Sequence, residues 1–211
     1  MTSHPADMTE GLIKAHGEVE VLMPYLHLPV QSGDDQVLKA MNRKYNSTEY
    51  LSIIEKLRDV RPDIAFSSDI IVGFPGETDR SFENTLNLVE KVNYSQAYSF
   101  KYSRRPGTPG SIMQGQVSED IKTERLLALQ EMLDIQQFEF NNAFIGKSME
   151  VLVERRRRKD KLLVGKSPYM QAVHLLEDKY DIGNILRVNV FAADKNSLKA
   201  KSVQLLSKAT N

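Results

Sequence analysis

SSDIIVGFPGET, the stretch from Ser67 to Thr78, decides the fold of this chain. Its first half is apolar and β-favouring, which predicts a strand that ends at about Phe74. Gly73, Pro75 and Gly76 stop the extended run, because proline fixes φ and glycine admits positive φ. Thr78 can cap a following helix, in which apolar residues recur at helical spacing, namely Phe82, Leu86, Val89 and Val92. The stretch therefore predicts a strand, a turn and a helix.

Alternation along this strand sends neighbouring side chains to opposite faces. One face is apolar, which suits helices packed outside. The other face carries the carboxylate of Asp69, together with Ser67, Ile71 and Gly73. In parallel α/β folds, ligands bind where the strands end at their carboxyl side. We therefore predict a ligand site beside the Gly-Phe-Pro-Gly-Glu turn, with Asp69 either in that site or in a buried ion pair.

Two further strands share this strand–helix order, at residues 24–31 and 96–103. His27 and Gln31 fall on the inward face of the first, while Ser99, Lys101 and Ser103 are predicted to share a face of the third, with Lys101 as the opposite charge for Asp69. Helices are expected at about 34–43, 47–61, 78–92 and 118–144. The order predicts parallel strands with right-handed crossovers. Three strands cannot close a barrel, so residues 1–143 are predicted to be part of a larger α/β barrel.

From Met149 the hydrophobic period changes to two. Short alternating segments are separated by charged or glycine-containing turns, with apolar positions at Met149, Val151, Val153, Leu162, Val164, Val173, Leu175, Leu186, Val188, Val190, Val203 and Leu205. This pattern predicts a small antiparallel β-barrel of the oligonucleotide-binding type over residues 144–211.

The net charge of the chain also differs between these two regions. Residues 1–143 hold 14 Lys and Arg against 21 Asp and Glu, a net charge of −7, and residues 144–211 hold 14 against 7, a net charge of +7. A basic domain suggests a polyanion, most commonly nucleic acid. The first hairpin of the barrel is a predicted phosphate-binding segment, with Arg155, Arg156, Arg157, Arg158, Lys159 and Lys161. Arg104 and Arg105, in a loop rich in proline and glycine, are a weaker second candidate.

Several classes of protein are excluded by composition. The chain contains no cysteine, so disulfides, thiolate catalysis and ligation of zinc or iron–sulfur clusters by cysteine are excluded within it. There is no apolar run of membrane-spanning length and no signal peptide, which predicts a soluble cytoplasmic protein without a membrane partner. The Gly-Lys-Ser sequences at 146–148 and 165–167 lack the earlier glycine of a nucleotide-binding P-loop.

Four stretches together resemble one family, the radical S-adenosylmethionine methylthiotransferases. They are residues 2–5 (TSHP), 27–33 (HLPVQSG), 69–78 (DIIVGFPGET), and 100–103 (FKYS) followed by 105–109 (RPGTP). Residues 41–43 (MNR) and the RPGTP loop are similar to the branch that acts on tRNA, the MiaB type. The basic barrel resembles the TRAM domain that binds tRNA in these enzymes.

The resemblance implies addition of a 2-methylthio group to an isopentenylated adenosine next to the tRNA anticodon. It implies S-adenosylmethionine and two four-iron, four-sulfur clusters as cofactors, and tRNA rather than DNA as the partner. The cofactor-binding residues expected on this chain are Gln31, Ser32, Asp69, Ile71, Gly73, Lys101 and Ser103. No catalytic or metal-ligating residue is expected.

The family's cluster cysteines lie in regions that have no counterpart here, so the chain is expected to be a fragment that is inactive alone. A separate polypeptide that carries the missing half is one expectation. One alternative is a free-standing TRAM-type RNA-binding module without catalysis, and a more distant one is a metabolic barrel enzyme using Asp69 and His27. The incomplete barrel also predicts uneven stability, with a labile region 1–143 and a protease-resistant piece that begins between Phe144 and Met149.

Overall fold

The computed structural model of this chain describes residues 3–159 and 162–208. The chain divides into two compact units, Met1–Asp134 and Ile135–Asn211, which are described separately here. The division falls inside the long helix α6 (Glu119–Asn142), whereas the sequence predicts a boundary after residue 143, close to the end of the same helix.

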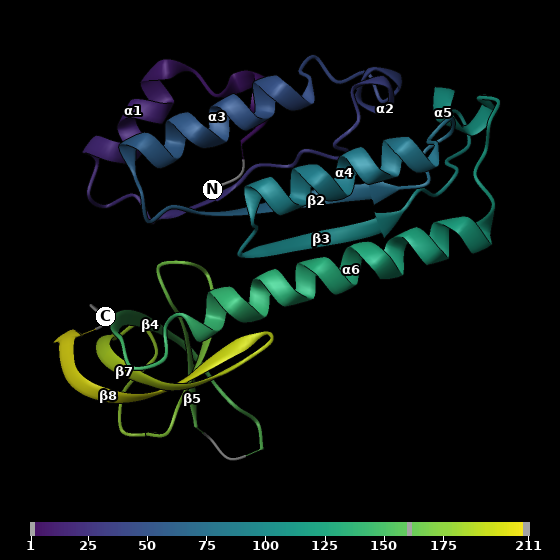
Figure 1. The fold of residues 1–211 in the computed structure, drawn as a ribbon. Helices are drawn as coiled ribbons and strands as arrows, with labels where there is room; N and C mark the ends of the chain where they lie inside the picture. The colour runs from purple at the N-terminus through teal and green to yellow at the C-terminus, as the bar shows by residue number, and fades with distance from the viewer. Residues whose placement is uncertain (1–2, 160–161, 209–211) are drawn as a thin grey trace. The chain divides into compact units, whose positions relative to one another are not determined.

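The first unit contains a three-stranded parallel sheet in the order β1-β2-β3 (Figure 1). The strands are β1 (Tyr25–His27), β2 (Ala65–Val72) and β3 (Gln96–Lys101). The predicted parallel arrangement is confirmed, but β1 is much shorter than residues 24–31. Pro29 has no N–H to donate to the sheet. Gln31 then rejoins the sheet through a single bridge to Ile70, with its own φ at +71°.

The helices begin where the sequence supplies caps. Thr78 Oγ1 accepts a hydrogen bond from Ser81 N at the start of α4, and Asn46 with Glu49 forms a reciprocal capping box at the start of α3. Ser118 Oγ accepts from Ile121 N in the first turn of α6. The helical elements of the first unit that precede α6 are η1 (Pro5–Asp7), α1 (Glu10–Glu18), α2 (Asp35–Ala40), α3 (Ser47–Val60), α4 (Asp79–Val92) and α5 (Pro109–Ile112).

One face of the sheet forms the core of this unit. Ile70 and Val72 of β2 are fully buried against residues from α3, α4 and α6, among them Tyr50, Ile54, Leu88, Val89 and Leu129. The opposite face is more open, since Tyr98 and Phe100 of β3 are 49% and 51% exposed. Helices on one side and an open polar and aromatic face on the other give the unit a side on which a ligand can bind.

The second unit is a closed five-stranded barrel in the order β4-β5-β6-β8-β7. Its strands are β4 (Ser148–Arg156), β5 (Leu163–Lys166), β6 (Ala172–Leu175), β7 (Ile185–Asp194) and β8 (Ser197–Ser207). Four neighbouring pairs are antiparallel, but β6 and β8 are parallel, which corrects the prediction of an antiparallel barrel. An odd number of strands cannot alternate in direction around a closed ring, so at least one pair must be parallel.

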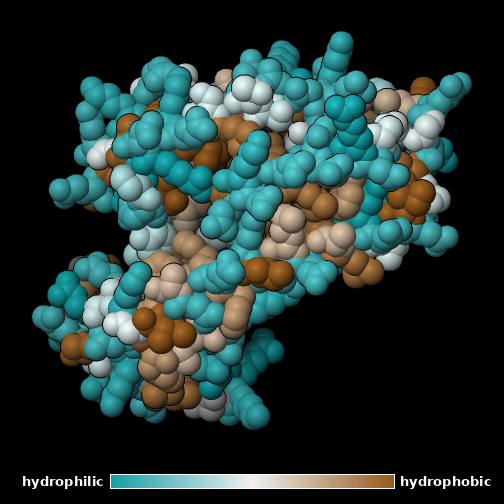
Figure 2. Space-filling view, viewed as in Figure 1, coloured by the Kyte–Doolittle hydropathy of each residue, from teal (hydrophilic) through white to brown (hydrophobic). Residues whose placement is uncertain are grey.

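The alternation read from the sequence is reproduced in the barrel core. Val151, Val153, Val173, Leu186 and Val188 are all buried in one hydrophobic cluster. Val203 differs from its predicted inward position and is 59% exposed, because the pairing of β7 with β8 shifts register between Arg187 and Val188 and again after Val190. Apolar side chains therefore interrupt the otherwise hydrophilic surface of this unit, visible as brown atoms at the lower left of Figure 2. Within the described residues, no helix has both the length and the apolar character needed to cross a membrane.

Candidate functional site

A cleft of about 940 Å³ lies at the carboxyl ends of β2 and β3 in the first unit. It is the position that parallel α/β sheets offer to ligands. Its lining combines charged, amide and aromatic groups from the sheet, the segment after α2 and the loop after β3: Gln31, Ala40, Met41, Asn42, Arg43, Asp69, Ile71, Phe74, Phe100, Lys101, Tyr102, Ser103, Arg105, Thr108, Pro109 and Gly110.

Asp69 occupies the predicted inward face and faces His27 of β1. The Nε2 atom of His27 lies 3.6 Å from Oδ2 of Asp69, whose side chain is 34% exposed. The Nδ1 atom of the same ring lies 2.8 Å from Ser67 Oγ, which accepts a hydrogen bond of 2.6 Å from the hydroxyl of Tyr25. Since Ser67 accepts from Tyr25, its own proton is available for Nδ1, which leaves Nε2 as the donor toward Asp69. A polar chain of Tyr25, Ser67 and His27 thus leads to the carboxylate along the open face.

The predicted pairing of Asp69 with Lys101 is wrong. In the register of β2 and β3, Ile71 lies opposite Phe100 and Val72 lies opposite Lys101. The side chain of Lys101 therefore shares the helix-covered side with Val72, and its amino group lies 3.4 Å from Glu119 and 3.3 Å from Thr123 Oγ1 of α6. The face predicted for Ser99 and Lys101 belongs instead to Tyr98 and Phe100.

Five of the seven residues expected to bind the cofactor line the cleft, namely Gln31, Asp69, Ile71, Lys101 and Ser103. Ser32 is fully buried on the other side, where its Oγ lies 3.3 Å from Thr85 Oγ1 of α4 and accepts a hydrogen bond from Asp34 N. Gly73 is needed for packing. Its φ is +74°, and a Cβ at this position would lie 2.3 Å from Cγ of Lys122 in α6.

Among the cleft residues that were not singled out from the sequence as binding residues, three carry groups suited to a ligand. Arg43 and Tyr102 each bring a buried polar atom, the Nε and the hydroxyl oxygen, that has no hydrogen-bond partner among the described residues. Phe100 brings an exposed aromatic ring. The MNR sequence at 41–43 could have indicated Arg43 as a site residue. Phe100 was missed because the sequence analysis assigned the wrong face of β3 to the site. Unsatisfied donors beside an aromatic surface are suited to a polar ligand with a ring.

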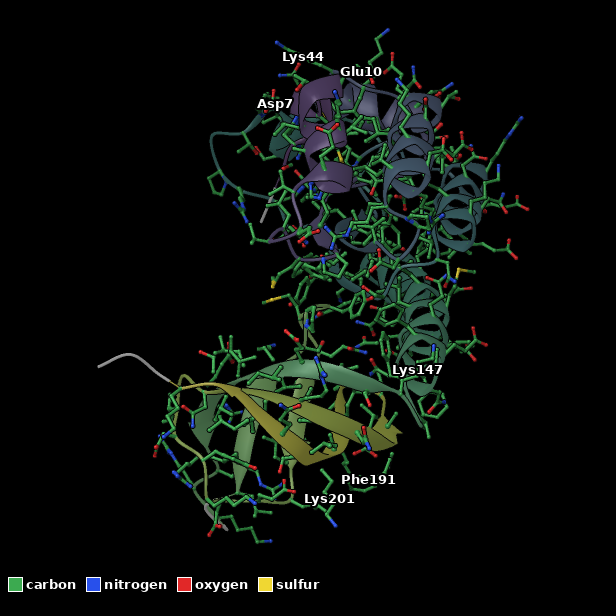
Figure 3. The ribbon with its side chains drawn as sticks, turned by 90° about the vertical axis from the view of Figure 1, so that its left-hand side faces the viewer. Asp7, Glu10, Lys44, Lys147, Phe191 and Lys201 are labelled. Atoms are coloured by element: carbon green, nitrogen blue, oxygen red, sulfur yellow. The ribbon has the colours of Figure 1, made fainter. Side chains whose placement is uncertain are left out.

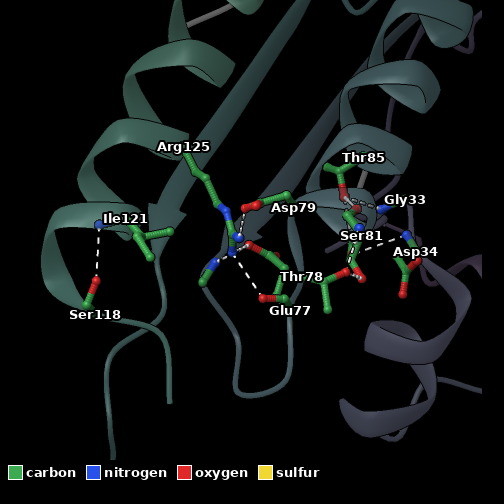
Figure 4. A network of polar contacts seen from close by, with 12 residues as sticks. Gly33, Asp34, Glu77, Thr78, Asp79, Ser81, Thr85, Ser118, Ile121 and Arg125 are labelled. Carbon is green, nitrogen blue, oxygen red and sulfur yellow. Dashed lines mark hydrogen bonds and ion pairs between the residues drawn. The ribbon is translucent and has the colours of Figure 1, made fainter. Parts of the chain in front are cut away.

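Below the cleft, a buried ion pair holds the Gly-Phe-Pro-Gly-Glu turn (Figure 4). Arg125 of α6 lies 2.8 Å from Oε1 of Glu77 and 2.7 Å from Oδ1 of Asp79, and the side chains of Arg125 and Glu77 are only 7% and 1% exposed. The same Oε1 accepts a hydrogen bond from Gly73 N. Burial raises the pKa of Glu77, while the Gly73 N–H and the Arg125 guanidinium oppose this shift. The pair fixes the turn at the end of β2 to α6.

The basic hairpin lies between β4 and β5 in the second unit. Arg155, Arg158 and Lys159 are exposed and Arg157 is half-buried. Arg156 is engaged within the unit, because its guanidinium donates to the carbonyl oxygens of Asp178 and Tyr180 at 2.7 and 2.8 Å. Lys161 lies outside the described residues. In the first unit, Arg105 lines the cleft, and Arg104 donates to Gln116 Oε1.

Comparisons with known proteins find similar sequences. A sequence model of the Radical SAM superfamily matches residues 1–89. Over 200 residues, 95% of this chain, the sequence is 55% identical to the tRNA-2-methylthio-N(6)-dimethylallyladenosine synthase of Agrobacterium fabrum. The chain spans 44% of the length of that relative.

A solved structure is similar in fold. Coproporphyrinogen III oxidase (HemN) from Escherichia coli, described as a Radical SAM enzyme, matches 93% of this chain and 49% of its own chain, with a TM-score of 0.55 and 14% sequence identity. The predicted resemblance to the radical S-adenosylmethionine tRNA methylthiotransferases is thus confirmed, since nearly the whole of this chain is similar to a part of such an enzyme.

Proposed function

We propose that this chain is the second half of the radical S-adenosylmethionine barrel and the TRAM domain of a tRNA methylthiotransferase. The reaction is the addition of a 2-methylthio group to an isopentenylated adenosine next to the anticodon. The observation that carries the proposal is the 55% identity over 95% of this chain to a synthase of that name. The comparisons give no support to a separate polypeptide that carries the first half, and the proposal does not require one.

In this proposal the cleft holds the nucleoside and amino-acid parts of S-adenosylmethionine. When bound, that cofactor supplies the radical and the methyl group. The residues of this chain that would hold it are Gln31, Asp69, Ile71 and Ser103, with Arg43 and Phe100 added from the structure. Lys101 lines the cleft, but its amino group is engaged by Glu119 and Thr123 of α6. Asp69, which lies 3.6 Å from His27, offers an acceptor for a ribose hydroxyl or an ammonium group. Arg43 Nε offers a donor for a carboxylate. Ser32 and Gly73 act through packing behind the cleft.

The iron–sulfur clusters of the family do not fit the residues present. These clusters are held by cysteine thiolates, and none of the 211 residues is cysteine. We assign no step of the reaction to a cluster bound by this chain, and we expect the chain to be inactive alone.

The barrel acts as the RNA-binding part in this proposal, in a cytoplasmic enzyme. Residues 144–211 carry a net charge of +7, from 14 basic and 7 acidic residues, and around the first hairpin Arg155, Arg158 and Lys159 are exposed and Arg157 is half-buried. Forked guanidinium donors suit phosphate oxygens, and each neutralised phosphate releases counterions. Arg156 is bound to backbone carbonyls and is therefore a weaker candidate.

Two measurements on the full chain test the proposal. A fluorescence assay with an unmodified tRNA should give binding that weakens steeply as salt rises. The variant Arg157→Ala/Arg158→Ala should weaken it, and Lys14→Ala, on an exposed helix of the first unit, should not. Equilibrium dialysis should detect S-adenosylmethionine binding that Asp69→Asn reduces. Absence of both tRNA and cofactor binding would refute the proposal.

The absence of cysteine also favours a second candidate, an RNA-binding module without catalysis. The same measurements separate the two. Binding of tRNA without any binding of S-adenosylmethionine favours the module, because the cleft then has no role.

A further inference from the structure

The outer surface of the barrel carries a line of basic side chains that extends beyond the hairpin. It follows from the strand pairing, in which Val164 lies opposite both Arg155 and His174, and Lys199 lies opposite both His174 and Ala192. Val173 and Leu198 belong to the barrel core, so alternation directs their neighbours His174 and Lys199 outward. Neighbouring strands lie about 4.8 Å apart, so His174 lies next to Lys199, while the buried Val164 separates His174 from Arg155.

Electrostatics agree that these side chains lie close together. Burial and the charges of Arg157, Arg155 and Lys199 lower the pKa of His174, and Asp194 acts in the opposite sense. Asp194 lies 3.0 Å from Lys199, and both side chains are about half exposed. Burial is the largest cause of this lowering, and the contributions of the three cations show that they lie near His174, which suits a chain of phosphates.

Phe191 lies at the end of this row, on β7. It is the extra residue of a bulge, because Val190 pairs with Ala200 and Ala192 already pairs with Lys199. Its ring is 48% exposed, although burial would be favourable for an aromatic side chain. Lys201 follows Lys199 on the outer side of β8, and Figure 3 shows Phe191 and Lys201 on the same side of the barrel. The backbone N–H of Gly146 donates a hydrogen bond to the carbonyl oxygen of Val190, the residue before Phe191. Glycine has no side chain that could cover the Phe191 ring.

A single exposed aromatic residue is common on protein surfaces and by itself indicates nothing. Phe191 differs because it stands beside exposed lysine residues at the end of a basic line. Single-stranded nucleic acid is bound by this combination, in which cations follow the backbone and an aromatic ring stacks on a base. In a duplex the faces of the bases are already stacked on one another, so they are not available to stack on the Phe191 ring.

We propose that the outer face of the barrel binds an unpaired stretch of RNA. Its phosphates follow the cations Arg155, Lys199 and Lys201, with the His174 imidazole lying between Arg155 and Lys199, and one base stacks on Phe191. The inference rests on the proposed RNA binding of this domain and adds the path of the strand and the stacking residue.

The test uses the full chain and two labelled probes, a single-stranded RNA of about 12 nucleotides and a duplex RNA of the same length. The variant Phe191→Leu should bind the single strand about 5- to 150-fold more weakly, because stacking on one base is lost, and should bind the duplex as before. Phe191→Tyr should retain binding, since it keeps the ring. Lys201→Gln should lower the slope of the logarithm of affinity against the logarithm of salt by about 0.7.

Phe138→Leu is the matched control, because Phe138 of α6 is an exposed aromatic residue outside the basic row. It should change neither affinity. Circular dichroism confirms that each variant keeps its strand content.

Four results would overturn the inference. The first is an unchanged affinity of Phe191→Leu for the single strand. If Arg157→Ala/Arg158→Ala still weakened RNA binding in that case, the proposed function would stand and the inference about Phe191 would fail. Equal losses on the single strand and the duplex would exclude stacking. Binding of an acidic peptide with the same dependence on Phe191 would indicate a protein partner. If the unmodified chain bound no RNA, both the inference and the proposed RNA binding would fail.

Discussion

The buried pair of Glu77 and Arg125 makes the sharpest prediction of stability. Arg125→Ala leaves the Glu77 carboxylate 1% exposed and without its main cation, while its Oε2 already has no hydrogen-bond partner among the described residues. Removal of one partner of a buried pair costs about 3–5 kcal/mol. Since folded domains are stable by only about 5–15 kcal/mol, the first unit should lose a large part of its stability. We expect its melting temperature to fall by roughly 10–20 °C.

The loss should also depend on pH, with a sign that follows from Glu77. Its pKa is already raised by burial above the ordinary 4.5, and Arg125 opposes that shift. In Arg125→Ala the folded-state pKa rises further, so the ionised carboxylate destabilises the fold above that pKa and the penalty is relieved as pH falls through it. The deficit relative to the unmodified chain should therefore be greatest at about pH 7 and smaller at about pH 5.

Hydrogen exchange of peptides that cover residues 65–92 measures this effect in the first unit alone. Lys56→Ala is the control, because it removes an exposed ion pair with Glu10 that is worth at most about 1 kcal/mol. The double variant Arg125→Ala/Glu77→Gln should recover part of the loss by removing the buried charge. The reasoning fails if Arg125→Ala loses no more protection than the control, or if its deficit is the same at both pH values.

Three further predictions concern the fold. Gly73→Ala should destabilise the first unit by at least about 1–2 kcal/mol in urea unfolding, because its φ is +74° and the new Cβ would meet Lys122; an unchanged midpoint would contradict this. Tyr50→Phe should cost about 1–3 kcal/mol in the same assay, since its buried hydroxyl donates to Leu28 O and lies 2.9 Å from the hydroxyl of Tyr94. Limited proteolysis with mass analysis should leave a C-terminal piece that begins between residues 144 and 149, whereas resistance throughout residues 1–143 would show that the first region is stable alone.

Local features of the fold could be read from the sequence because their causes are local. The strand at Ser67–Val72, the turn after it and the cap at Thr78 depend on neighbouring residues, and all three are present. The capping box of Asn46 with Glu49 depends on a spacing of three residues. Alternation along β2 correctly separated Asp69 from the buried Ile70, because the period of a strand is two whatever it packs against.

Only the tertiary structure decided which residues meet across the fold. Alternation along β3 alone does not tell which of its two faces is inward, because that depends on the register of β3 with β2. In this register Phe100, rather than Lys101, lies beside Ile71. It also made His27 the partner of Asp69 and brought Arg125 to Glu77 across 48 positions of sequence. The parallel pairing of β6 with β8 follows from closure of five strands, which no single strand reveals. Closure and register are properties of the assembled sheet, because they depend on strands that are distant in sequence.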